Sequence, residues 1–335
     1  MRQRRDETVG HQAIAADALS HYEIQSPIIA FIRHNENLTY KITDESGSSY
    51  LLRVHKPVHA ELHGLQHSKA GLSGEMELLQ ALGENTALNV QKPVRNREGE
   101  FVTRISNGGG FLHCTMLHWL EGRDSQPDDF ASREAALRYG RQVGMLHRFT
   151  SGYTPDPAAN RPTYAGIGEN EAMLERLTYG RDHGIFVPGD FALMSEAFRL
   201  INERLRRYDP EPGTWGIIHA DINRANVIVT AQGFTLIDYC LYGHGYFLYD
   251  AAGGALSVPS ERRTDFMEGY AAEFSSMRSD SMKLLEGFML LNNFGYYSFH
   301  MMNTAVHPWM RERLPSFCAD KVAPFLEDKP IFHLL

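Results

Sequence analysis

The stretch IIHADINRANVIVTAQGFTLIDY, residues 217–239, decides how the rest of this 335-residue chain is interpreted. Two apolar runs, NVIV and FTLID, are joined by the short polar turn TAQG, a pattern that predicts a β-hairpin. Three polar side chains, Asp221, Asn226 and Asp238, stand at the borders of these runs. Two carboxylates and a carboxamide where the pattern otherwise predicts core indicate a functional site.

The spacing of these three residues predicts that they converge. If the hairpin is centred near Gln232, Asn226 and Asp238 are equally distant from its turn and meet at the open end. Asp221 precedes Asn226 by five residues, so the intervening loop can return it to the same end. Taken alone, each is more simply explained as a loop former that bonds its own backbone. Together they make an oxygen-rich set that suits Mg²⁺, which binds carboxylates, water and phosphate.

HADINRAN followed by LIDY resembles the H-x-D-x-x-x-x-N catalytic loop and the D-F-G-type metal motif of protein kinases. It is more similar still to the aminoglycoside phosphotransferase and choline kinase-like family, in which Ala or Gly takes the second position and I-D-F or I-D-Y is common. The resemblance implies that Asp221 is the catalytic base for the acceptor hydroxyl and that His219 supports the loop. It also implies that Asn226 and Asp238 are the magnesium ligands.

The organisation of the chain agrees with this resemblance, which covers residues 27–255. Strand-like runs such as PIIAFIR, LTYKIT and YLLRVH, together with one helix, GEMELLQALG, predict a small β-rich lobe at 27–120 that binds the nucleotide. Residues 1–26 are expected to form a frayed extension with a short helix. Residues 121–335 are predicted to be mainly helical, with the catalytic loop and the acceptor-binding region. The expected fold class is α+β, a bilobal protein kinase-like fold with a small antiparallel sheet.

The triphosphate of ATP needs a cation on the small lobe, and that cation needs an acid to hold it. The third predicted strand offers Arg53 where kinases place a lysine, and a guanidinium can bind phosphate through its planar fork. Lys56 is the rival, but it follows the strand next to a proline. On the predicted helix, Glu75 shares the face of the buried leucines and is the expected partner of Arg53. Glu77 belongs to the solvated side.

The segment RHNENLTYKI is expected to contain the loop that covers the phosphates. It has no glycine, so it differs from the Gly-rich loop of protein kinases. The backbone amides of a tight turn at Asn35–Asn37, with Asn35 and Asn37 at its ends, are expected to serve instead. The adenine is expected on the crossover that links the lobes. Its apolar walls and backbone hydrogen bonds would come from Leu117, His118, Trp119 and Leu120.

Composition excludes several other classes of protein. Thirty-three basic and 41 acidic residues give a net charge of −8, which disfavours a nucleic acid partner. No stretch approaches the roughly 18 apolar residues of a membrane span, and the N-terminus lacks the apolar core of a signal peptide. Three scattered cysteines fit a reducing cytoplasm rather than a disulfide framework.

Histidines recur every four residues at His55, His59, His63 and His67. This spacing suggests a metal site only weakly. Pro57 and Gly64 make one continuous helix unfavourable, so we expect a solvated, pH-sensitive loop here.

Three functions are consistent with these patterns. The favoured one is an ATP- and Mg²⁺-dependent phosphotransferase whose acceptor is the hydroxyl of a small molecule, as in aminoglycoside, choline or homoserine kinases. A protein Ser/Thr kinase resembling the bacterial stress-response kinases is the first alternative. It is disfavoured because only 11 residues separate Asp238 from Asp250, leaving little room for an activation loop. A non-catalytic scaffold of the spore-coat type is the second. It has no physical need for the Asp221–Asn226–Asp238 set.

Overall fold

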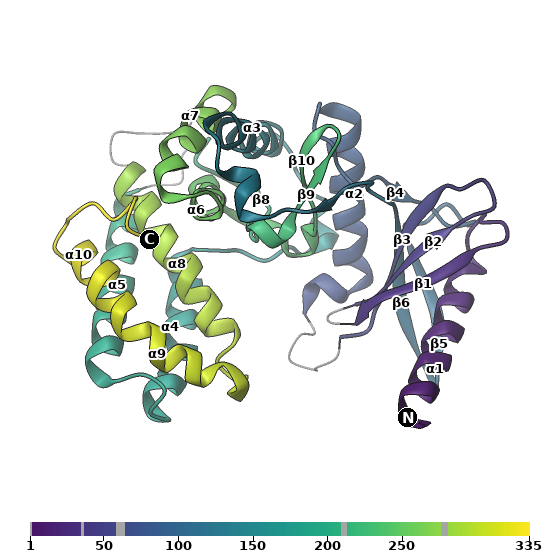
Figure 1. Ribbon diagram of the computed structural model, residues 1–335, viewed down its shortest axis with the longest axis horizontal. Coiled ribbons are helices and arrows are strands. Elements are labelled where there is room, and N and C mark those ends of the chain that lie inside the picture. Colours follow the sequence, from purple (N-terminus) through teal and green to yellow (C-terminus); the bar gives the residue numbers. More distant parts are fainter. Residues whose placement is uncertain (1, 35–36, 58–63, 209–212, 276–280) are drawn as a thin grey trace. The chain divides into compact units, whose positions relative to one another are not determined.

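The computed structural model describes residues 2–34, 37–57, 64–208, 213–275 and 281–335 (Figure 1). The chain divides into two compact units. The first, unit 1, comprises Met1–Arg123, Pro155–Arg161 and Ile228–Leu241. The second, unit 2, comprises Asp124–Thr154, Pro162–Val227 and Tyr242–Leu335. Unit 1 therefore extends the predicted lobe 27–120 by the N-terminal helix and two short segments from later in the sequence.

The main sheet of unit 1 is antiparallel, with the strand order β1-β2-β3-β6-β4 and β5 paired to β6. Its strands are β1 (Ile28–His34), β2 (Leu38–Thr43), β3 (Ser49–His55), β4 (Pro93–Val94), β5 (Val102–Asn107) and β6 (Gly110–His118). The turn between β2 and β3 is held by Asp44, whose Oδ1 accepts hydrogen bonds from the amides of Ser46 and Ser48. This sheet confirms the small antiparallel sheet predicted from the strand and turn signals.

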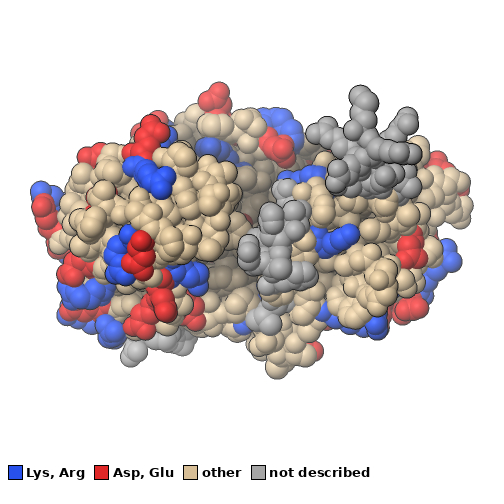
Figure 2. Space-filling view, turned by 90° about the horizontal axis from the view of Figure 1, so that it is seen from below, with Lys and Arg blue, Asp and Glu red and all other residues tan. Residues whose placement is uncertain are grey.

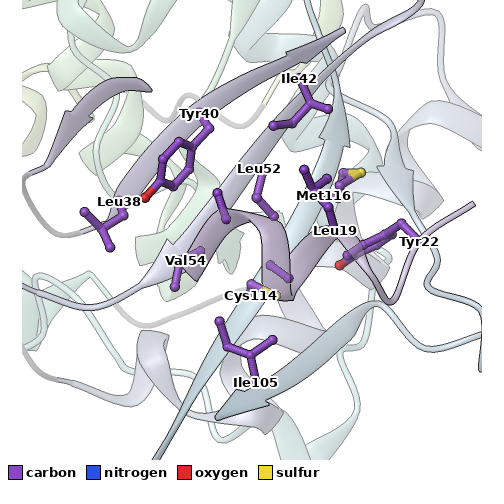
Figure 3. Close-up of a cluster of buried hydrophobic side chains, with 12 residues drawn as sticks. Leu19, Tyr22, Leu38, Tyr40, Ile42, Leu52, Val54, Ile105, Cys114 and Met116 are labelled. Carbon is purple, nitrogen blue, oxygen red and sulfur yellow. The ribbon is translucent and has the colours of Figure 1, made fainter. Parts of the chain in front are cut away.

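Two helices pack on unit 1's sheet, and the strand alternation decides what each one meets. On β3, Leu52 and Val54 face α1 (Arg2–Leu19), and they join the buried cluster drawn in Figure 3. Arg53 and His55 point to the other face, toward α2 (Lys69–Asn85). The cluster on the α1 side consists of Ala15, Ala18, Leu19, Tyr22, Leu38, Tyr40, Ile42, Leu52, Val54, Ile105, Cys114 and Met116.

The hairpin predicted from the opening stretch is present. Strand β9 (Val227–Thr230) is joined to β10 (Gly233–Leu236) by two residues, and β7 (Arg123–Asp124) lies on the other side of β9. Thr230 stabilises the turn because its hydroxyl donates to the carbonyl of Gly233 and accepts from the amide of Gln232. Gly233 has φ +110, a backbone conformation that favours glycine.

Unit 2 is mainly helical, as expected, with a two-stranded ribbon of β8 (Trp215–Ile218) and β11 (Gly243–Tyr246). Four short 3-10 turns matter below. Three belong to unit 1, η2 (Leu65–His67), η4 (Pro157–Ala159) and η6 (Tyr239–Leu241), and one belongs to unit 2, η5 (Arg224–Asn226). The helices are α3 (Arg133–Thr150), α4 (Ile167–Asp182), α5 (Pro188–Arg207), α6 (Phe247–Ser257), α7 (Arg263–Glu273), α8 (Ser281–Phe299), α9 (His307–Phe317) and α10 (Ala323–Leu326).

Helices α3 and α7 of unit 2 approach so closely that their contact requires glycine (Figure 1). A Cβ added at Gly140 would lie 2.0 Å from the carbonyl oxygen of Phe266, and one at Gly269 would lie 2.1 Å from that of Leu137. Because the neighbouring atoms are backbone, they cannot swing away. This contact fixes α3, which carries His147 toward the catalytic loop.

The structure corrects two expectations. The N-terminal region forms an 18-residue helix, α1, rather than a short one, because Ala15 and Ala18 lie against the sheet and are buried. The segment around the repeated histidines is not a solvated loop where the structure describes it. His55 ends β3 and His67 lies in η2, and both are buried. His59 and His63 lie outside the described residues.

Among the described residues, no helix is long and apolar enough to cross a bilayer. On the face shown in Figure 2, acidic and basic side chains are interspersed over the surface.

Candidate active site

The catalytic-loop segment is held by a buried carboxylate. Asp250, in α6, accepts hydrogen bonds from the amide of His219 at 2.6 Å and from the amide of Ala220 at 2.9 Å. Its carboxylate also accepts from Nε2 of His147 at 3.1 Å, and Nδ1 of that ring lies 2.9 Å from the hydroxyl of Tyr270. A carboxylate can only accept here, so Nε2 of His147 donates to Asp250. Three donors therefore hold this carboxylate, and two of them are amides of the loop.

Ala220 has φ +68, in the left-handed region that residues with a side chain rarely adopt. A conformation of this kind costs on the order of 1–3 kcal/mol and persists only where the surroundings impose it. The bond from its amide to Asp250 is such a constraint. The conformation also explains physically why a small residue occupies this position of the motif.

The Asp221 carboxylate is oriented by two amides of the same loop. Asn223 Nδ2 donates to Oδ1 and Asn226 Nδ2 donates to Oδ2, both at 2.7 Å. The amide of Asp221 donates to Nδ1 of His219 at 3.3 Å, so the buried imidazole supports the loop from inside. Since Asn226 uses its nitrogen on Asp221, its amide oxygen is the atom left to coordinate a cation.

Tyr249 lies close enough to this loop to feel its charge. Burial raises the pKa of the Tyr249 hydroxyl, and the negative charges of Asp250 and Asp221 raise it further. The phenol is therefore neutral at physiological pH. Sequence reasoning did not identify Tyr249, because a tyrosine before an acidic residue in a helix is an ordinary core pattern.

In unit 1, the predicted cation and acid form a buried ion pair. Arg53 Nη1 donates to Glu75 Oε1 at 2.9 Å, and the side chains are only 7% and 2% exposed. Arg53 Nη2 and Glu75 Oε2 are buried as well, and neither has a hydrogen-bond partner among the described residues. Glu77, on the same helix, is exposed. Arg53 therefore pairs with Glu75, the glutamate that the helix periodicity predicted.

Asp238 contributes to the electrostatics of Arg53. Burial acts to lower the pKa of Arg53, but the negative charge of Glu75 and then that of Asp238 raise it, and the net shift is upward. Asp238 has φ +65, a second left-handed residue that is not glycine. Both residues belong to unit 1, whereas Asp221 and Asn226 belong to unit 2. The convergence of Asp238 with the catalytic loop stays a prediction.

The far side of the Arg53 guanidinium is also held. Its Nε donates to the hydroxyl of Thr115 at 3.3 Å, and His55 Nε2 lies 3.0 Å from the same hydroxyl. Burial, and next to it the charge of Arg53, lowers the pKa of His55 well below its usual range. A neutral imidazole can accept the proton of Thr115, which completes a chain from His55 to Arg53. The sequence offered no signal for this chain, because Thr115 is 62 residues from Arg53.

The segment predicted to bind adenine, residues 117–120, begins in the last two residues of β6. Leu117 is buried within the sheet, while the amide of His118 donates to Lys92 O at 2.8 Å and that of Trp119 to Ser49 O at 3.0 Å. These two amides are therefore occupied by the sheet, and a nucleotide base bound here would need another donor, such as Leu120. The contribution of the four residues Leu117, His118, Trp119 and Leu120 to nucleotide binding stays a prediction.

The predicted phosphate-covering turn is described only at its second end. Asn35 lies outside the described residues. Asn37 is half-buried, and its Oδ1 is enclosed without a hydrogen-bond partner among the described residues. No contact of this turn with a nucleotide follows from these facts, so its role also stays a prediction.

Comparisons with known proteins identify the family of this chain. Residues 28–285 match the model of the phosphotransferase enzyme family. The amicoumacin kinase of Bacillus subtilis (strain 168) is 26% identical over 282 residues, which cover 78% of this chain and 76% of that protein.

Two solved structures share the fold at 21% identity. The microcompartment-associated aminopropanol kinase gives a TM-score of 0.76 over 94% of this chain and 98% of its own. Amicoumacin kinase hAmiN, in complex with AMP-PNP, Ca²⁺ and Ami, gives 0.73 over 98% and 99%. The family match covers most of the chain and includes the loop held by Asp250, and the sheet and helices are those of the kinase fold. This protein therefore belongs to the phosphotransferase enzyme family and is a kinase with the bilobal protein kinase-like fold.

Proposed function

We propose that this enzyme transfers the γ-phosphate of ATP, with a divalent cation, to a hydroxyl of a small molecule. The observation that carries the proposal is the buried Arg53–Glu75 ion pair with an unused guanidinium nitrogen. An unsatisfied buried donor costs about 1–3 kcal/mol, and a ligand oxygen that accepted from it would remove this cost. A phosphate oxygen is the partner that a guanidinium fork fits best.

We extend the proposal to a divalent metal ion. Asn226 and Asp238 would hold it, because the amide oxygen of Asn226 is not used on Asp221 and the carboxylate of Asp238 carries the charge. A Mg²⁺ ion bound there would neutralise charge on the β- and γ-phosphates. The related structure of amicoumacin kinase hAmiN holds AMP-PNP together with Ca²⁺, which supports the same choice of ligands.

Asp221 would accept a hydrogen bond from the acceptor hydroxyl and orient it for in-line attack. Two amides hold its carboxylate, so its direction is set before the acceptor arrives. Phosphoryl transfer needs little covalent help from the protein, and positioning together with charge neutralisation supplies most of the rate. Arg53 would neutralise the donor phosphates while Glu75 keeps its side chain in place.

A small acceptor is favoured over a protein. Between Asp238 and Asp250 the chain is taken up by η6, β11 and the first turn of α6, with no long loop to bind a peptide. By name, the relatives act on amicoumacin and aminopropanol, which are small molecules. We therefore expect a small molecule that carries a free hydroxyl.

The test measures ADP release by the purified chain with ATP and MgCl₂ across a panel of amino alcohols, aminoglycosides, other antibiotics and sugars. We expect turnover with one class of acceptor. Asp221→Asn keeps the shape of the side chain and should lower kcat by about 10²–10⁴-fold, the usual contribution of a general base.

Asp128→Asn is the matched control. Asp128 is exposed in the same unit, so the same chemical change there should leave kcat unaltered. Full activity of Asp221→Asn would refute the assigned role. Label from ATP that appears on protein in a lysate, rather than in the soluble fraction, would favour a protein acceptor instead.

A further inference from the structure

Residues 155–161 leave the helical region and belong to unit 1. They follow α3 and precede α4 in the sequence, yet they pack on α2 through the short helix η4. Asp156 caps η4 by accepting the amide of Ala158 at 2.8 Å. Asn160 then adopts φ +44, in the left-handed region, immediately before Arg161. Asparagine adopts this conformation readily, so Asn160 ends η4 and sets the direction in which the chain continues to Arg161.

Arg161 bridges two backbone carbonyls of unit 1. Its Nη1 donates to Gly71 O at 3.3 Å and its Nη2 donates to Cys240 O at 2.5 Å. The residue is 8% exposed, so these charge-assisted bonds lie in a largely dry environment. The two carbonyls are 169 residues apart in the sequence. A single guanidinium thus ties together two segments that the sheet does not connect.

The two carbonyls belong to the segments that carry the ATP-site residues. Gly71 lies one helical turn before Glu75 on α2, about 6 Å along a rigid helix. Cys240 lies two residues after Asp238, in η6, which packs on α2. Asp238 has a strained backbone, so its position depends on the contacts around it. Arg161 supplies one of these contacts directly after it.

We propose that Arg161 is a positioning residue, which sets the distance between the Arg53–Glu75 pair and the metal-binding carboxylate Asp238. The inference rests on the proposed function, because it assigns a task to the same ATP site. Arg161 need not touch the nucleotide. Its effect reaches the site through α2 on one side and the turn after Asp238 on the other.

The test compares AMP-PNP binding by the full chain in MgCl₂ and in EDTA, by calorimetry. In the wild type, MgCl₂ should tighten binding. Arg161→Ala should lose about 10–100-fold in affinity in MgCl₂, the usual cost of removing a residue that orients a metal ligand. In EDTA the variant and the wild type should differ far less, because Asp238 then has no metal to hold.

Guanidinium at about 10 mM should restore part of the affinity of Arg161→Ala, a concentration too low to unfold a protein. The matched control is Arg263→Ala. Arg263 is also buried and donates to backbone carbonyls, those of Ala255, Phe332 and Leu335, but it lies in unit 2. This variant should lose stability and keep the Mg²⁺-dependent gain in affinity.

The possible outcomes separate the two proposals. A wild type that does not bind AMP-PNP with MgCl₂ overturns the proposed function and this inference with it. A wild type that binds, with an Arg161→Ala variant that binds equally well, overturns the inference alone. So does an equal loss in MgCl₂ and EDTA without rescue by guanidinium, because a merely structural role predicts it. If Arg161→Ala does not fold, Arg161→Gln replaces it, because its amide keeps a donor for these carbonyls. The quantity compared is again the ratio of the AMP-PNP affinities in MgCl₂ and in EDTA.

Discussion

Arg53 Nη1 and Glu75 Oε1 lie 2.9 Å apart in an environment from which water is almost excluded. Neither charge would be stable there without the other, because each loses most of its hydration on burial. The pair therefore has a structural consequence and a functional one. It makes the small lobe sensitive to the loss of either partner, and in the proposed function it supplies the positive charge for the phosphates.

Glu75→Gln should lower the free energy of unfolding by about 3–5 kcal/mol, because it leaves Arg53 buried without a counter-charge. Urea denaturation measures this change. Glu77→Gln is the control on the same helix, since Glu77 is exposed, and it should shift stability by no more than about 0.5 kcal/mol. Equal effects of the two substitutions would mean that the ion pair contributes nothing specific.

Ala220→Val should lower the free energy of unfolding by about 1–3 kcal/mol, because a β-branched residue at φ +68 is strongly strained. Ala220→Gly should remain within about 1 kcal/mol of the wild type, since relief of strain is offset by the greater freedom of glycine in the unfolded chain. Ala225→Val, at an exposed position of the same loop, is the control. Equal changes in the free energy of unfolding for Ala220→Val and Ala225→Val would contradict the strain assigned to Ala220.

Gly140→Ala should destabilise unit 2 by about 1–3 kcal/mol, because the new methyl group meets the backbone of α7. Gly189→Ala is the control, at a helical glycine with open space around it. It should be neutral or stabilising by up to about 1 kcal/mol, as alanine favours helix. Thermal unfolding of the two variants checks the difference, and a stabilised Gly140→Ala would show that α3 and α7 are less closely packed.

Stability should depend on pH through His55. Burial, then the charge of Arg53 and those of His67 and His113, lowers the pKa of His55 in the folded chain. In the unfolded chain its pKa returns to about 6.5, so below that pH the unfolded state binds a proton that the folded state does not. The contribution is thus fully present above about pH 6.5 and is lost as pH falls toward the lower folded value.

Urea denaturation between pH 7.5 and pH 5.5 measures this dependence. The slope from one such group is at most about 1.4 kcal/mol per pH unit. His55→Gln should reduce the slope relative to the wild type, while other partly buried histidines with lowered pKa values keep some of it. Parallel curves for wild type and variant would exclude His55 as a contributor.

The sequence alone predicted the local parts of this protein. The hairpin after the catalytic loop followed from two apolar runs around a polar turn, and the face of Glu75 followed from the spacing of leucines on one helix. Such patterns repeat every two or 3.6 residues, so a short window of sequence contains them. The same periodicity could not show that Arg53 also contacts Thr115, because periodicity assigns a side chain to a face and not to a neighbour.

Only the tertiary structure decided which distant residues hold the site. His147 contacts an aspartate 103 residues away, Arg161 bridges carbonyls 90 and 79 residues from it, and neither stands in a motif. Contacts of this kind depend on how helices and strands are stacked, and a chain can satisfy a buried carbonyl or carboxylate with many different donors. The motif of the catalytic loop could therefore be recognised from its own residues, whereas the contacts that support the loop became visible only in the tertiary structure.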